Sequence, residues 1–129
     1  MSHTVEVKTK FKQEQVHALK KALEHLNWQW EENTTMKEYS GQGTKKFRYV
    51  GKNPNRQSYD VGFEVDKDGN LTPYTDLWGG SVEATLGKDF SKLKQEYGFR
   101  VIEDHYEALG AMVSREWTGQ TMQVTVDMF

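Results

Sequence analysis

The sequence predicts an α+β fold in which a mostly antiparallel sheet is covered on one face by two amphipathic helices, in the order β-α-β-β-β-β-α-β-β. Three observations lead to this prediction. Several short runs alternate between apolar and polar residues, two longer segments have apolar residues spaced by three and four, and glycine-containing turns separate the runs. The 129 residues contain no internal repeat, low-complexity tract or linker, so we expect a single domain over residues 1–129.

The N-terminal quarter predicts a strand and then a helix. Residues 4–11 alternate strictly, which is typical of a half-buried strand with one apolar face formed by Val5, Val7, Thr9 and Phe11. The spacing then changes to that of a helical stripe over residues 12–26, carried by Val16, Leu19, Leu23 and Leu26. Asn27 is the expected end of this helix.

The middle of the chain predicts four strands. The first is extended from Trp28 to residue 40, and residues 40–44 have the composition of a turn. The second places Phe47 and Tyr49 on one face, and residues 51–55 form a loop. The third, residues 59–65, alternates most clearly and places Phe63 in the core. Residues 68–69 (Asp-Gly) predict a hairpin turn into the fourth, residues 71–78, where Pro73 indicates an edge or a bulge.

The C-terminal part predicts a second helix and a hairpin. The helix has one apolar face, Gly98 weakens its middle, and Gly110 ends it; the face is formed by Phe90, Leu93, Tyr97, Val101 and Ala108. Residues 118–121 (Thr-Gly-Gln-Thr) predict a tight turn that pairs Trp117 with Met122, Arg115 with Val124, and Val113 with Val126. Arg115 is the single charge on this apolar face and should pair with a carboxylate, such as Asp76 or Asp60.

Composition excludes several kinds of chemistry. The chain has no cysteine, which excludes disulfides, thiolate metal sites, cysteine nucleophiles and iron–sulfur clusters. It has no apolar run of the length of a membrane span and no visible secretory signal, so we expect a cytoplasmic or plastid stromal protein that does not contact a membrane. His17 and His25 are too far apart for one metal ion, and His105 borders the apolar face of the second helix, where we expect it to be packed. No serine lies in a recognisable nucleophile motif, so we expect no catalytic residue, metal or cofactor.

Charge is distributed unevenly along the chain. Residues 1–56 carry 11 Lys and Arg against 6 Glu, whereas residues 57–129 carry 6 Lys and Arg against 13 Asp and Glu. Aromatic residues interleave with cations between residues 37 and 56, a mixture that suits phosphate contacts and base stacking. The candidate binding residues in this basic strip are Lys45, Lys46, Arg48, Lys52 and Arg56. A solvated hairpin whose lysines keep a sheet edge soluble is the structural alternative, and the overall pI of about 6.1 favours it.

Two glycine-rich segments superficially suggest other sites. Residues 41–46 lack the Gly-Lys-Ser/Thr ending of a phosphate-binding loop, and a strand follows them where a helix should begin. Residues 66–70 begin like a calcium loop but continue as a strand without the closing Glu, so we interpret them as a hairpin turn.

Trp78 stands before two glycines at the end of a predicted strand and has two interpretations. It either closes one end of the core, which the pattern slightly favours, or lies at the rim of the sheet as a protein-contact residue. Together with Tyr59 and Asp76 it could also line a pocket for a small ligand.

Four short motifs, taken in their order along the chain, resemble the ycf-thirty-five-like family. They are Met1-Ser2-His3, Leu26-Asn27-Trp28, Tyr59-Asp60-Val61-Gly62-Phe63 and Asp76-Leu77-Trp78-Gly79. This family of plastid, cyanobacterial and phage proteins has a domain of unknown function. The resemblance implies a small protein of a cyanobacterium, a plastid or a cyanophage, the last acting in the host-cell cytoplasm. Similar bacterial proteins often neighbour genes for an AAA-type ATPase and a ferredoxin, which implies an accessory role.

These observations leave three functional hypotheses. The first is a non-enzymatic accessory protein that binds another protein, because no catalytic constellation is visible. The second is a nucleic-acid-binding module that uses the basic strip. The third is a small-ligand binder or enzyme with a pocket near Tyr59, Asp76 and Trp78.

Overall fold

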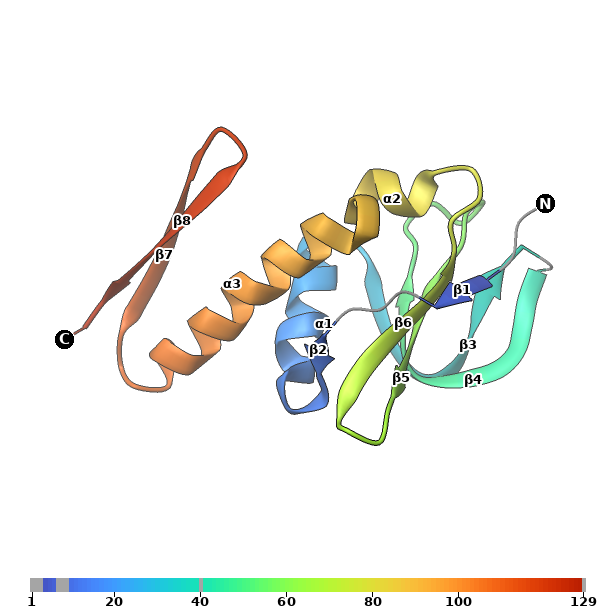
Figure 1. Cartoon of the computed structure of the whole chain (residues 1–129), viewed down its shortest axis with the longest axis horizontal. Coiled ribbons are helices and arrows are strands. Elements are labelled where there is room, and N and C mark those ends of the chain that lie inside the picture. The colour runs from blue at the N-terminus through green and yellow to red at the C-terminus, as the bar shows by residue number, and fades with distance from the viewer. Residues whose placement is uncertain (1–3, 7–9, 40, 129) are drawn as a thin grey trace.

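The computed structural model, which describes residues 4–6, 10–39 and 41–128, confirms the α+β class (Figure 1). Six strands form one sheet in the order β1-β6-β5-β4-β3, and the sixth strand, β2, pairs with β6. All of these pairs are antiparallel. The strands are β1 (Thr4–Glu6), β2 (Phe11–Lys12), β3 (Gln29–Glu38), β4 (Gly41–Lys52), β5 (Val61–Val65) and β6 (Asn70–Asp76). The helices are α1 (Val16–His25), α2 (Ser81–Leu86) and α3 (Ser91–Glu107), and the separate C-terminal hairpin is β7 (Met112–Thr118) with β8 (Thr121–Asp127).

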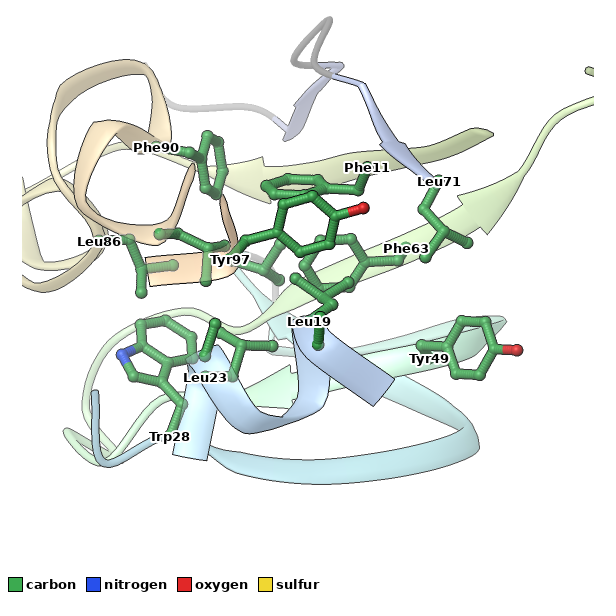
Figure 2. Packing of buried hydrophobic residues seen from close by; sticks show 14 of the residues in the cluster. Phe11, Leu19, Leu23, Trp28, Tyr49, Phe63, Leu71, Leu86, Phe90 and Tyr97 are labelled. Carbon is green, nitrogen blue, oxygen red and sulfur yellow. The ribbon is translucent and has the colours of Figure 1, made fainter. Parts of the chain in front are cut away.

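The helices pack on one face of the sheet, as predicted, and together they bury the main core. This core joins residues of all three helices to inward-facing residues of β2, β4, β5 and β6 (Figure 2). Phe63 is fully buried, which confirms the predicted core face of β5, and the Phe11 ring makes edge-to-face contacts with Phe63 and Tyr97. The labelled members of the core are Phe11, Leu19, Leu23, Trp28, Tyr49, Phe63, Leu71, Leu86, Phe90 and Tyr97.

The N-terminal region differs in detail from the prediction. The expected strand over residues 4–11 is present as β1 and β2, which pair separately with β6, and the intervening Val7, Lys8 and Thr9 lie outside the described residues. The predicted helix begins with a 3-10 turn (Gln13–Gln15) before α1. It ends where expected, because Asn27 adopts a left-handed conformation with φ of 68°.

The β3–β4 hairpin is longer than the sequence indicates. Residues 41–44, expected to be a turn, belong to β4, because Gly41 and Gln42 pair with β3; Gly51 and Lys52, expected in a loop, also belong to β4. Phe47 and Tyr49 do not share a face: Tyr49 joins the main core, whereas Phe47 packs with Met36 and Val50 on the opposite side of the sheet. Tyr49 pairs with Glu32 of β3, and Phe47 pairs with Thr34. Asn33 lies between these two partners, and its φ of 53° breaks the regular alternation of side chains at this point.

Pro73 lies in an inner strand, so of the two placements that the sequence suggested, an edge or a bulge, the edge was wrong. It pairs with Phe63 of β5 on one side. On the other side β6 pairs with β2 up to Leu71 and with β1 from Tyr74 onward, and Pro73 falls between these two stretches. No described residue pairs with Pro73 on this second side, so its missing backbone N–H removes no hydrogen bond from the described part of the ladder.

The second helical region contains an element that the sequence did not indicate. The short α2 precedes α3, and Val82 and Leu86 of α2 are buried in the core. Gly87 separates the two helices with φ of 85°, and a Cβ at this position would clash with the Ser91 hydroxyl oxygen. Gly98 does not break α3, which is continuous through residue 107.

The C-terminal hairpin has the predicted register. Trp117 pairs with Met122, Arg115 with Val124 and Val113 with Val126. The principal contact of this hairpin with the rest of the fold is between β7 and α3. No helix in the described part of the chain is long and apolar enough to cross a membrane.

Candidate protein-contact site

One rim of the sheet gathers three residues that the sequence singled out, Tyr59, Asp76 and Trp78, together with Tyr39. Backbone pairing explains why they meet. The N–H of Asp60 donates to the carbonyl of Lys37 at 2.9 Å, which brings the segment preceding β5 beside the end of β3. The pairing of Val61 with Thr75 then brings the end of β6 to the same rim. We call the four side chains of Tyr39, Tyr59, Asp76 and Trp78 the rim patch.

Two rings of the rim patch are mostly exposed. Tyr39 is 57% exposed and Trp78 is 59% exposed, yet their rings contact each other edge-to-face with centroids 6.2 Å apart. The interpretation of Trp78 as a core residue was therefore wrong. Trp78 directly precedes a chain reversal formed by Gly79 and Gly80, both with positive φ. Its indole lies outside the helix-covered core.

A buried carboxylate binds the backbone of Trp78. Asp76 is 1% exposed, and its Oδ1 accepts a hydrogen bond from the Trp78 backbone N–H at 3.0 Å. Its Oδ2 is buried and has no hydrogen-bond partner among the described residues. The pKa of the Tyr59 hydroxyl is raised, mainly because the half-buried side chain is partly removed from water and also because of the negative charge of Asp76. The electrostatic field of this carboxylate therefore reaches Tyr59.

A second carboxylate, Asp60, organises the loop that leads to the rim patch. It is fully buried, and its Oδ1 accepts hydrogen bonds from the Asn53 backbone N–H at 2.9 Å and from Arg56 at 3.0 Å. Its Oδ2 accepts the Lys37 backbone N–H at 2.8 Å, and Lys52 Nζ lies 3.5 Å away. Two cations of the predicted basic strip, Lys52 and Arg56, thus neutralise an internal charge.

The remaining three cations of the basic strip, Lys45, Lys46 and Arg48, have different surroundings. The Lys45 ammonium lies 3.6 Å from Glu64 and 4.9 Å from the centroid of the Phe47 ring. The Arg48 guanidinium lies 5.7 Å from the Tyr49 ring centroid, and Lys46 is exposed. The basic strip therefore is not a uniform surface of unpaired cations.

The C-terminal hairpin is joined to α3 through a carboxylate that the sequence did not suggest. Arg115 donates to Glu96 and stacks on the Phe99 ring at 4.1 Å, so the expected partners Asp76 and Asp60 were wrong. Glu96 is 5% exposed and also accepts a hydrogen bond from Arg100 at 3.0 Å. An open groove of about 560 Å³ lies at the hairpin tip, lined by residues of α1, α3 and the hairpin, among them His25, Lys92, Glu96 and Trp117.

The three histidines of the described ranges lie apart from one another in exposed positions. His17 and His25 are exposed, as predicted, and His105 is also exposed instead of packed, with its ring against Tyr106. Within the ranges that the structure describes, no group of three or more His, Asp or Glu side chains is placed to hold a metal ion.

The composition of the rim patch was partly visible in the sequence. Tyr59, Asp76 and Trp78 stood near strand ends, where side chains of neighbouring strands converge. Tyr39 was missed, because nothing in the sequence indicates that the end of β3 approaches the segment before β5. That approach depends on the Asp60 backbone and side chain, whose partners are distant in the sequence.

Comparison with known proteins identifies the family. Residues 22–126 match the family model described as protein of unknown function (DUF1257), and the chain belongs to this family. No curated protein and no solved structure matches the chain.

Proposed function

We propose that this member of the DUF1257 family is a non-enzymatic accessory protein that binds another protein through the rim patch. The observation that carries the proposal is the exposure of two contacting rings, Tyr39 and Trp78, at the rim of the sheet. Tryptophan and tyrosine are enriched among residues that dominate binding energy, because each buries a large area and loses few rotamers. A contacting pair of exposed rings gives a partner a ready apolar contact surface.

The charge at the rim patch favours a partner segment that carries a lysine or an arginine. Ring faces attract cations, and Asp76 adds a negative charge for which the described residues supply no paired cation. A tyrosine hydroxyl has an ordinary pKa of about 10 and is protonated at neutral pH, so the half-buried Tyr59 can donate a hydrogen bond to a partner. An apolar contact with one cationic side chain is therefore the interaction that this surface suits best.

Protein binding is better supported than nucleic-acid binding. Lys52 and Arg56 pair with the buried Asp60, and Lys45 lies near Glu64, so three of the five cations proposed for phosphate contact have intramolecular carboxylate partners. Retention on heparin and DNA that falls steeply with salt would reverse this preference, because phosphate binding releases counterions. A small ligand bound between Tyr59, Asp76 and Trp78 is the remaining alternative.

The family resemblance suggests where to look for the partner. The ordered motifs resemble ycf-thirty-five-like proteins, so we propose that the chain acts in the cytoplasm of a cyanobacterium, in the plastid stroma, or in the cytoplasm of a cyanophage host. A lysate of photosynthetic cells is therefore the first source for a partner.

The test compares the wild-type chain with Trp78→Ala and Trp117→Ala as baits in that lysate. Trp117 is 50% exposed on the hairpin, so its substitution controls for the loss of an exposed indole elsewhere. We expect one stoichiometric protein to be captured by the wild type and by Trp117→Ala and to be lost with Trp78→Ala. With the purified partner, Trp78→Ala should weaken the Kd by about 30-fold or more, while thermal unfolding stays nearly unchanged. Equal capture by all three baits would contradict the proposed surface.

A further inference from the structure

The C-terminal hairpin exposes a strand edge that lacks the usual protection against pairing. In the described part of the chain, β7 and β8 form a sheet of two strands, and β7 is the strand in contact with α3. The outer strand, β8, has the sequence Thr-Met-Gln-Val-Thr-Val-Asp. It contains no proline, lysine or glycine, and its only charge is the terminal Asp127. Natural edge strands usually carry such residues to prevent pairing with another chain.

The outer edges of the main sheet and the hairpin differ in this respect. The edge strand β3 carries Glu31, Glu32 and Lys37, and its register shifts between Thr35 and Lys37. These charges and this irregularity oppose edge-to-edge pairing. On β8 the side chains alternate between an apolar face of Met122, Val124 and Val126 and an uncharged polar face that ends at Asp127.

We propose that β8 pairs antiparallel with β8 of a second copy of this chain, so that two hairpins form one four-stranded sheet across a two-fold axis at Val124. This interface goes beyond the partner contact proposed for the rim patch. In this register Val124 lies opposite its own symmetry mate, Met122 opposite Val126, and Gln123 opposite Thr125. Every apolar residue meets an apolar residue, and Asp127 lies opposite Thr121, so no like charges face each other. Such self-complementarity is what a two-fold interface requires.

The backbone of β8 supports the same register. The two-residue turn pairs Thr118 with Thr121, and a β-turn of this kind closes with a hydrogen bond between these two residues. Because hydrogen-bonded and non-hydrogen-bonded pairs alternate in an antiparallel ladder, Met122, Val124 and Val126 direct their N–H and C=O groups away from β7. A symmetric pairing centred on Val124 uses these three residues of each copy. An isolated two-stranded hairpin is marginal in water, so pairing would also stabilise it.

The experiment uses two double variants that differ only in the sign of the charge at position 125. In the proposed dimer, Gln123→Lys with Thr125→Lys places lysine opposite lysine at two symmetric positions, whereas Gln123→Lys with Thr125→Glu places lysine opposite glutamate. Both variants change only the exposed polar face of the hairpin. Sedimentation over a hundredfold or so concentration range should show a dimer of the 15.0 kDa chain for the wild type and for the lysine–glutamate variant. The dissociation constant of the lysine–lysine variant should rise by about tenfold or more.

Amide exchange measured by NMR distinguishes the proposed interface from any other. The N–H groups of Met122, Val124 and Val126 should become protected as the concentration rises. Protection of Val113 and Trp117 instead would show pairing through β7 and overturn the proposal. A wild-type chain that is monomeric at every concentration, or two double variants that associate equally, would overturn it as well. Because neither double variant touches the rim patch, loss of the dimer and loss of partner capture are separable results.

Discussion

Arg115 on β7 donates to the Glu96 carboxylate on α3, and this ion pair attaches the C-terminal hairpin to the rest of the fold. Glu96 is almost fully buried, and the side chain of Arg115 is 17% exposed and stacks on Phe99. Arg100 holds the other Glu96 oxygen, at 3.0 Å. The carboxylate is therefore fixed by its own helix, and the hairpin binds to it through one side chain.

Replacing Arg115 should loosen the hairpin without unfolding the domain. Arg115→Ala removes a largely buried charged hydrogen bond and the stacking on Phe99, and we expect it to lower the free energy of hairpin opening by about 1–2 kcal/mol. Hydrogen exchange should become faster in β7 and β8 while the exchange of β5 and β6 stays unchanged. Glu116→Ala, on the exposed face of the same strand, is the matched control. Unchanged exchange in the Arg115 variant would show that other contacts hold the hairpin.

The buried Asp60 should be among the most sensitive polar positions. Asp60→Asn keeps the shape of the side chain but replaces one acceptor oxygen by a donor, which must then face the Lys37 N–H, the Asn53 N–H or Arg56. The loss of the negative charge also leaves Lys52 without its nearby carboxylate. We expect the free energy of unfolding to fall by about 2–4 kcal/mol in chemical denaturation. Asp68→Asn, in an exposed turn, should change it little, and a similar small change for Asp60→Asn would contradict this role.

The sequence predicted best those elements whose signal is local. Alternation placed Phe63 in the core, helical spacing placed Leu19 and Leu23 on the buried face of α1, and the two-residue turn at 119–120 determined the register of the C-terminal hairpin. The six residues of α2 are too few to show a helical period, so this helix was missed.

The candidate site depended more on contacts between distant segments. A lone arginine on an apolar hairpin face indicated that a carboxylate partner exists, but only the docking of β7 on α3 selects Glu96 among the acidic residues. In the same way, the pattern around Trp78 could not distinguish a core residue from an exposed one. That difference arises from two positive-φ glycines that turn the chain after β6.

Stability should fall at both extremes of pH because of one ionic cluster between α1 and α3. Burial by itself would raise the pKa of Glu103 and Asp104, but hydrogen bonds from Arg100 to Glu103 and from Lys21 to both carboxyls lower each pKa below its ordinary value. A lowered carboxyl pKa contributes stability that is present above the unfolded value of about 4 and is lost as the pH falls through the folded value. Burial would lower the pKa of Lys21, but its hydrogen bonds to Asp104 and Glu103 raise it above 10.5, so its contribution is lost only as the pH rises through the folded value.

Urea denaturation as a function of pH, with Lys21→Met as the variant, measures this linkage. The free energy of unfolding of the variant should decline less steeply than that of the wild type, both below about pH 4 and above about pH 10. Lys20→Met removes a charge from an exposed neighbouring position and should leave both declines as in the wild type. Parallel pH profiles for the wild type and Lys21→Met would contradict the assignment.

Two glycines should respond to alanine in opposite directions. A Cβ at Gly62 would lie 2.6 Å from Cγ of Phe47 and 2.8 Å from both Cδ atoms, and Phe47 is 5% exposed and packed against Tyr74. The ring must therefore shift, and Gly62→Ala should lower the free energy of unfolding by about 1–3 kcal/mol. A Cβ at Gly98 in α3 meets nothing within 4 Å, so Gly98→Ala should raise the free energy of unfolding by about 0.5–1 kcal/mol through helix propensity. Chemical denaturation of the two variants checks both signs at once. Stabilisation by Gly62→Ala would show that the Phe47 ring moves aside freely, and destabilisation by Gly98→Ala would show that α3 needs a flexible position at its centre.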